Sequence, residues 1–389
     1  MTVQATMTKR RKESPSTSRV DELPAHILRS IFNRLRFNDL VQAKSVCCSW
    51  NLLGDELTSK MPWLMLPSKK QVEEDDGIKV NNNGYHGFLN LKENRLYSLK
   101  TAPKEFSECC CIGSSHGWLV FLQEKAVPFL FNPFKQLRIE LPSVDRQLGL
   151  EKMETSTRMF NPEIDSNQKT TTMETMDIIC HRNHLYALSD KNSIEVWDLH
   201  IGGNHVKKKS DFVFAFPDKS LAKEKSFRDV CTSGFYLVES CGDLLFVVRF
   251  IGDYVDWDGT LLHEQDHLTQ DSNHPKVCPY RTFLFHVYKM DFKELKWVEM
   301  DTLGDRALFL GRNQLASVST RCFLNCEKDC IYFSDDCWER IDEDYLYGGH
   351  DMGIYNLKDG SLKPVFEFSS DKIQPQPCWV IPDPAMFES

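Results

Sequence analysis

Residues 113–142 read GSSHGWLVFLQEKAVPFLFNPFKQLRIELP, and this stretch shows how most of the chain is built. An apolar run at Trp118–Leu122 leads through a polar turn into a second run, Phe129–Asn132, which ends in an aromatic residue and Asn. A third run follows at Leu137–Leu141. Short, aromatic and β-branched runs bounded by Gly, Asn and Pro are typical of strands. The stretch therefore predicts consecutive antiparallel strands joined by polar turns.

The same layout recurs three more times along the chain. Its first two strands return as the pairs Leu185–Leu188 and Val196–Asp198, Leu244–Val248 and Phe285–Tyr288, and Cys330–Phe333 and Gly353–Asn356. The third strand returns at Asp211–Phe216, Leu295–Met300 and Lys363–Phe368. A repeated antiparallel sheet that cannot bury both of its faces alone is the signature of a β-propeller.

A further blade is expected from Trp63–Leu66, Gly87–Leu91 and Arg95–Leu99, closed by the C-terminal Cys378–Ile381. Residues 61–389 are therefore predicted to form an all-β propeller of about five blades. The alternative is a β-sandwich or two smaller β domains, but the repetition favours the propeller. Insertions at about 143–175, 252–280 and 338–350 interrupt the period, and we expect them to be surface loops.

Residues 20–60 carry a helical period instead of a β period. Pro24 suits a first helical turn because its missing N–H would have no partner there. Asn38 or Asp39 is the predicted N-cap of a second helix. The apolar positions of the three short helices are Ile27, Leu28, Ile31 and Leu35, then Leu40 and Ala43, then Val46, Trp50, Leu53 and Leu57. The prediction is a small all-α domain that precedes the propeller.

A unit of about forty residues is too small to bury all of these apolar faces by itself. Exposed apolar patches normally mark a partner surface, so the sequence predicts a docking site on the first helix. The alternative is that these residues face the propeller and complete one fused core. Val46, Trp50 and Leu53 could also belong to the interior of the helical unit.

Composition narrows the classes of partner. Residues 1–19 are rich in Ser, Thr, Lys and Arg, which predicts a disordered basic tail. Its Lys9–Lys12 cluster is either a nuclear import signal or a solvated charge run. A formal net charge of −9 argues against direct nucleic-acid binding, because phosphate neutralisation needs a clustered basic surface.

Cysteine usage and hydropathy indicate the compartment. Fourteen cysteines are spread over 389 residues, whereas disulfide scaffolds are short and cysteine-dense. The N-terminus lacks the apolar core of a signal peptide, and no segment provides the roughly 18 apolar residues of a membrane span. We expect a soluble intracellular protein, in the nucleus, the cytoplasm or both, without a membrane partner.

Residues 21–53 have a specific spacing of apolar and polar positions: a Leu-Pro start, an Asp39-Leu40 step and a Val-Cys-x-x-Trp run. This segment closely resembles the F-box family, although Cys48 replaces the usual basic residue after Val-Cys. The resemblance implies docking on a Skp-type adaptor and, through it, on the cullin and RING subunits of an SCF ubiquitin ligase. The residues implied in adaptor binding are Leu23, Pro24, Ile27, Leu28, Ile31, Leu35, Leu40, Val46, Cys47 and Trp50.

The remainder of the chain, from about residue 60, resembles plant F-box proteins with a KIB-type propeller. The match rests on Gly113–Val120, Phe131–Phe134 and Leu141–Pro142. It implies that the propeller recruits a target protein, of unknown identity, for ubiquitination. An F-box protein that sequesters its target without ubiquitinating it is the alternative. We expect the target surface in the loops around Asp253–Pro279 and Trp338–His350.

Other chemistry is not expected from this sequence. The spacing of Cys322, Cys326, Cys330 and Cys337 differs from the paired spacing of zinc sites, and successive residues of Cys109–Cys111 point to opposite faces of a strand. Asp253, Asp256 and Asp258, with Asp335 and Asp336, are the candidates for a propeller glycosidase, but acidic residues are also common turn formers. No phosphate loop, zinc-protease helix or nucleophile elbow is present in the sequence. We predict no catalytic residue, metal or cofactor.

Overall fold

The computed structural model describes residues 23–58, 62–67, 85–91, 93–98, 109–115, 118–123, 127–132, 137–141, 175–182, 184–189, 193–198, 207–208, 231–253, 280–311, 315–322, 326–336, 350–365, 373 and 377–380. The chain divides into two compact units. One is Met1–Ser59 with Phe387–Ser389, and the other is Lys60–Met386. The basic tail at 1–19, the strand predicted at 211–216 and most of the three insertions lie outside the described residues.

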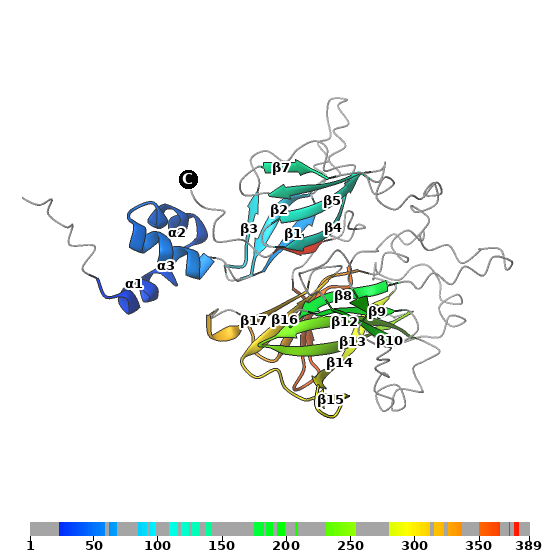
Figure 1. Ribbon diagram of the computed structural model, residues 1–389. Helices are drawn as coiled ribbons and strands as arrows, with labels where there is room; N and C mark the ends of the chain where they lie inside the picture. Colours follow the sequence, from blue (N-terminus) through cyan, green and yellow to red (C-terminus); the bar gives the residue numbers. More distant parts are fainter. Residues whose placement is uncertain are drawn as a thin grey trace, which may run out of the picture. The chain divides into compact units, whose positions relative to one another are not determined.

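The first unit contains three short helices, α1 (Ala25–Phe32), α2 (Phe37–Lys44) and α3 (Cys48–Thr58) (Figure 1). Pro24 precedes α1 as its N-cap residue, and its carbonyl accepts bonds from the amides of Ile27 and Leu28 at 2.9 and 3.1 Å. The predicted start of the second helix at Asn38 or Asp39 is wrong, because α2 begins at Phe37 with Arg36 as its N-cap residue. The Leu40 amide bonds to the Arg36 carbonyl, and Asp39 lies in the first turn, where its charge suits the helix dipole.

The helices bury one apolar cluster. Leu28, Phe32, Leu40 and Leu53 form its centre, and Leu35, Ala43, Trp50 and Leu57 pack around them. The rings of Phe32 and Trp50 meet edge to face with centroids 5.1 Å apart. This contact joins α1 to α3. The cluster contains seven of the ten apolar residues that the helical period predicts.

The second unit is a propeller of five sheets, which confirms the predicted fold (Figure 1). Blade 1 contains β21 (Cys378–Val380), β1 (Trp63–Pro67), β2 (Tyr85–Asn90) and β3 (Arg95–Ser98). Blade 2 contains β4 (Cys109–Ser115), β5 (Trp118–Gln123), β6 (Pro128–Asn132) and β7 (Leu137–Glu140). Blade 3 contains β8 (Thr175–His181), β9 (His184–Ser189), β10 (Ser193–Asp198) and β11 (Lys207–Lys208).

Blade 4 contains β12 (Cys231–Ser240), β13 (Asp243–Gly252), β14 (Arg281–Asp291) and β15 (Lys296–Met300). Blade 5 has five strands, in the order β17 (Ala316–Ser319), β16 (Arg306–Leu310), β18 (Cys330–Phe333), β19 (Gly353–Asn356) and β20 (Leu362–Lys363). A short 3-10 helix, η5 (Thr320–Cys322), follows β17. Strands β16 and β18 pair in parallel, in contrast to the antiparallel pairing of the repeat.

The ring closes through strands from opposite ends of the propeller sequence. β21 pairs antiparallel with β1, so that Trp63 faces Val380 and Met65 faces Cys378. Along the inner edges of the blades, β4 contacts β21, β8 contacts β12, and β12 contacts β17. The sequence prediction that the C-terminal strand completes the first blade is therefore confirmed.

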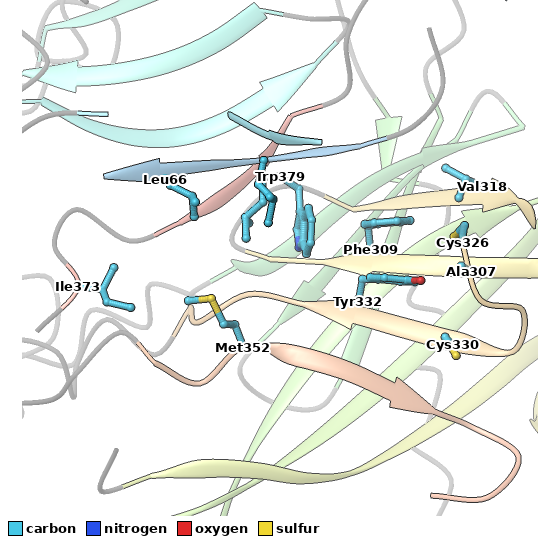
Figure 2. Close-up of a cluster of buried hydrophobic side chains, with 12 residues drawn as sticks. Leu66, Ala307, Phe309, Val318, Cys326, Cys330, Tyr332, Met352, Ile373 and Trp379 are labelled. Carbon is cyan, nitrogen blue, oxygen red and sulfur yellow. The ribbon is translucent and has the colours of Figure 1, made fainter. Parts of the chain in front are cut away.

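Apolar clusters join blade 1 to blade 5, blade 3 to blade 4, and blade 4 to blade 5. Between blades 1 and 5, Trp379 reaches from β21 toward Phe309 and Tyr332 (Figure 2). The Trp379 indole meets the Phe309 ring edge to face at 5.1 Å, and its Nε1 donates to the Leu310 carbonyl at 3.0 Å. Phe309 in turn stacks on Tyr332 at 4.6 Å. This aromatic group fixes the junction at which the ring closes.

Candidate functional site

The helical unit presents large apolar side chains on its surface. Leu23 and Ile27 are each 40% exposed and Ile31 is 43% exposed. Ile27 and Ile31 are spaced by four positions and share one face of α1, and Leu23 lies in the segment just before the helix. Leu28 and Phe32 lie on a buried side that is turned by about 100° from this face. The helix therefore has two apolar sides, one for its own core and one exposed.

Burial separates the ten residues predicted for adaptor binding. Leu23, Pro24, Ile27, Ile31 and Val46 are exposed. Leu35, Cys47 and Trp50 are half-buried, and Leu28 and Leu40 are buried in the helical core. The first group can contact a partner directly, whereas the core residues hold the exposed ones in place.

Sequence reasoning missed Leu52, which is 72% exposed on α3. The helical stripe assigned Trp50, Leu53 and Leu57 to one side of this helix. Leu52 is adjacent to Leu53, and a single residue turns a helix by about 100°. An apolar residue that falls off the core stripe was the available signal.

Helices α2 and α3 approach each other closely at Gly54. A Cβ atom on Gly54 would lie only 2.3 Å from the Cγ of Lys44, whose side chain is buried along its stem. Glycine at position 54 allows the helix pair that supports the exposed residues.

The propeller contains a second candidate region, a cluster of charged residues between blades 4 and 5. Arg249 of β13 is fully buried, and its guanidinium donates to the carboxylates of Asp336 at 2.8 Å and Asp351 at 2.9 Å. Asp335 accepts from the Tyr280 hydroxyl at 2.9 Å and from the Asp351 amide at 3.0 Å. Two of the five glycosidase candidates, Asp335 and Asp336, therefore bond to the protein's own donors.

The other acidic candidates differ in their surroundings. Asp253 accepts a bond of 2.5 Å from the Thr232 hydroxyl of β12. Asp256 and Asp258 lie outside the described residues. A glycosidase needs two carboxylates that face one sugar, and the bonding of Asp335 and Asp336 instead joins two blades.

The cysteines that the structure describes include several core residues. Cys326 and Cys330 are buried in the apolar cluster between blades 1 and 5, where burial raises the pKa of Cys326 to about 11. Cys109 and Cys111 are buried two positions apart on β4. Within the described ranges, no three His, Cys, Asp or Glu side chains are grouped as metal ligands. No helix in these ranges is long and apolar enough to cross a membrane.

Comparison with known families agrees with the two units. Residues 20–58 match the F-box-like family model, and residues 88–356, more than half of the chain, match the KIB1-4 β-propeller model. A helical F-box-like segment followed by a five-bladed propeller defines the class of protein. The chain belongs to the KIB1-4 β-propeller family.

Relatives from Arabidopsis thaliana are F-box proteins by name. The F-box/kelch-repeat protein KIB1 is 22% identical over 387 residues, covering 89% of this chain and 86% of the relative. The F-box protein SKIP23 is 24% identical over 396 residues, covering 90% of each. The putative F-box protein At4g22660 is 30% identical over 149 residues, and the chain spans about a third of that relative, 35%.

Among solved structures, the N-terminal domain of Nup159 aligns at 10% identity with a TM-score of 0.22. The alignment covers 75% of this chain and 60% of that domain. A score this low does not establish a shared fold.

Proposed function

We propose that this protein is the substrate-recognition subunit of an SCF-type ubiquitin ligase. In this proposal residues 20–60 dock on a Skp-type adaptor and residues 61–389 recruit a target protein. The observation that carries the proposal is the exposure of Leu23, Ile27 and Ile31 within the F-box-like match. The division of the chain between Ser59 and Lys60 supports the separation of the two roles.

Docking gains free energy from side chains that are already ordered. Ile27 and Ile31 lie on α1, whose backbone is held in place by the buried Leu28 and Phe32, so little backbone entropy is lost when a partner covers them. Covering the exposed 40–43% of each side chain contributes on the order of 1 kcal/mol per residue. Val46 and Pro24 are also exposed and add to the apolar surface of the helical unit.

The mechanism is catalysis by proximity, and the protein itself is a non-catalytic adaptor. The Skp-type adaptor connects the helices to cullin and RING subunits, and these supply the ubiquitin-transfer chemistry. Holding a target beside that machinery raises its effective concentration there. The proposed target-binding segments around 253–279 and 338–350 lie largely outside the described residues. The site of action is intracellular, in the nucleus, the cytoplasm or both.

The docking proposal is tested by co-purification of the full chain with a Skp-type adaptor. The test variant is Ile27→Ala with Ile31→Ala. The matched control is Leu137→Ala with Ile139→Ala on β7, because those residues are similarly exposed, at 50% and 47%. We expect the parent and the control to bind and the test variant to lose at least tenfold in affinity, since about 2 kcal/mol of contact is removed.

Failure of the folded parent to bind any Skp-type adaptor would overturn the proposal. Equal loss in both double variants would show that general surface hydrophobicity drives the association. A target captured equally by the parent and by the helix variant, but ubiquitinated only with the parent, would support the receptor role over sequestration.

A further inference from the structure

The buried charges between blades 4 and 5 form a single bonded group. Beyond its two carboxylate contacts, the Arg249 guanidinium donates to the backbone carbonyls of Ser334 at 3.0 Å and Asp351 at 3.1 Å. Its Nε donates to the Thr282 hydroxyl at 2.7 Å. The guanidinium also lies over the Phe333 ring, with its carbon 4.7 Å from the ring centroid. Arg249 thus reaches from β13 into blade 5 at several points.

Asp351 ties the same two blades from the opposite direction. One of its carboxylate oxygens accepts from the Thr282 amide at 2.8 Å, and the other accepts from the Thr282 hydroxyl at 2.7 Å. Asp336 accepts a further bond from the Tyr236 hydroxyl of β12 at 2.8 Å. Asp335 and Asp336, which follow β18, and Asp351, which precedes β19, therefore each bond to a strand or strand end of blade 4.

The charges in this group do not balance when every carboxyl is ionised. Asp335, Asp336 and Asp351 together carry three negative charges and Arg249 carries one positive charge, which leaves a net charge of minus two. Asp335 and Asp351 are each only 2% exposed. An unbalanced charge in a buried site costs several kcal/mol, so a carboxyl group there retains a proton if it can.

Asp335 is the group best placed to hold that proton. Asp336 and Asp351 accept bonds from the cationic guanidinium, whereas Asp335 accepts from two neutral donors. Burial, and next the negative charge of Asp351, raise the pKa of Asp335 to about 7, against the lowering effects of the Asp351 amide, Arg249 and the Tyr280 hydroxyl.

The titratable and polar side chains around Asp335 come from blades 3, 4 and 5. Arg249 comes from β13, Tyr236 from β12, Tyr280 and Thr282 from the start of β14, and Asp336 and Asp351 from blade 5. Asp177 of β8 adds a negative charge near Asp336 from blade 3. Only Arg249 among these groups is a cation.

We propose that this group is a proton-dependent clamp between blades 4 and 5. Asp335 carries a proton below neutral pH and releases it to solvent as the pH rises, which leaves two uncompensated negative charges in the junction. The clamp is consequently tightest in acid and looser above neutral pH. This inference does not depend on the proposed role in ubiquitination.

The direction of the effect follows from linkage. The folded-state pKa of about 7 lies above the ordinary value of 3.8, so the folded protein binds a proton that the unfolded chain releases. The stabilisation is complete below the unfolded pKa and is lost as the pH rises through the folded pKa. The propeller should thus lose stability between about pH 4 and pH 7.

The test is the thermal unfolding midpoint of the full chain from pH 5 to pH 8. Asp335→Asn keeps the shape and an acceptor oxygen but cannot ionise. We expect the parent midpoint to fall by about 5 °C over this range in excess of the variant. Asp291→Asn is the matched control, because Asp291 is an exposed carboxyl on the same propeller that titrates below this range. It should follow the parent.

Tyr280→Phe provides a second test that leaves the carboxyl group in place. It removes a hydroxyl that donates to Asp335 and favours the ionised form, so the fall in the midpoint should move to higher pH. Unchanged pH slopes in both Asp335→Asn and Tyr280→Phe would overturn the proposal and show that Asp335 does not titrate in this range. If Asp335→Asn does not fold, the pH at which the Tyr280→Phe midpoint falls tests the proposal by itself.

Discussion

The two junctions of blade 5 use different chemistry. Toward blade 1, Phe309, Tyr332 and Trp379 make an aromatic contact with one indole hydrogen bond. Toward blade 4, apolar packing is supplemented by Arg249 and its carboxylates. An apolar contact gains free energy from removing surface from water, whereas a buried ion pair must first overcome the loss of its hydration. The first junction should therefore respond to the size of side chains and the second to charge and pH.

The largest effect is expected from Arg249→Met. The substitution keeps an unbranched apolar stem but leaves Asp336 and Asp351 without their cation. Breaking a buried ion pair from one side costs about 3 to 5 kcal/mol of unfolding free energy. Denaturant unfolding at pH 5 and pH 8 measures it. The loss should be greater at pH 8, and an equal loss at both pH values would contradict the difference between the junctions.

Trp379→Phe should have a smaller effect at the other junction. The phenyl ring keeps most of the contact with Phe309, but the hydrogen bond from Nε1 to the Leu310 carbonyl is lost. The Leu310 carbonyl keeps its bond from the Ser334 amide, so the cost is that of one lost hydrogen bond and of the smaller ring, about 1 to 3 kcal/mol. Because no ionisable group takes part in that bond, the same loss is expected at pH 5 and pH 8 by denaturant unfolding. A pH-dependent loss would show that the two junctions are coupled.

Asp177 extends the charged chemistry toward blade 3. Its carboxylate accepts from the Leu237 amide of β12 at 2.7 Å, and burial raises its pKa to about 6. The folded-state pKa lies above the ordinary 3.8, so this contribution is present in acid and is lost as the pH rises through 6. Asp177→Asn should flatten the decline in the thermal midpoint between about pH 4 and pH 6. A slope identical to the parent would exclude Asp177 as a titrating group.

Gly311→Ala should give the smallest change in stability. Gly311 lies close to a residue of each junction. A Cβ atom there would lie 2.5 Å from the Ser334 hydroxyl oxygen and 3.2 Å from Cδ1 of Trp379. The hydroxyl can rotate, so the cost should be about 1 kcal/mol, at the low end for overpacking. Thermal unfolding measures this cost. A loss above about 3 kcal/mol would mean that Ser334 is fixed by the Arg249 group.

The sequence predicted the parts of this fold that depend on local patterns. Alternation and turn residues identified strands such as β5, β6, β13 and β19, and their recurrence identified the propeller. The pairing of β21 with β1 could be inferred because one apolar run remained after the complete repeats. The parallel pairing of β16 with β18 could not be inferred, because it depends on a crossover that leaves no mark on either strand.

The charged junction was not predicted from the sequence, for a different reason. Asp335 and Asp336 were interpreted as turn formers, and their partner Arg249 is 86 residues from Asp335 in the chain. A single arginine inside the apolar run Leu244–Ile251 was the signal, because a central strand rarely buries a cation without carboxylates nearby. Likewise, helical spacing located the apolar stripes at residues 23–57, but burial alone distinguished the exposed Ile27 from the buried Leu28.

Closure of the ring by β21 also sets an order of events during synthesis. The helices at residues 25–58 leave the ribosome long before Cys378, which blade 1 requires for its fourth strand. At about 5 to 20 residues per second, the interval is on the order of half a minute. Until then β1 has an open edge that can pair with another chain. A nascent chain can therefore fold its helices well before its propeller is complete. A truncated chain that ends before residue 378 would leave the β1 edge of blade 1 without its strand partner.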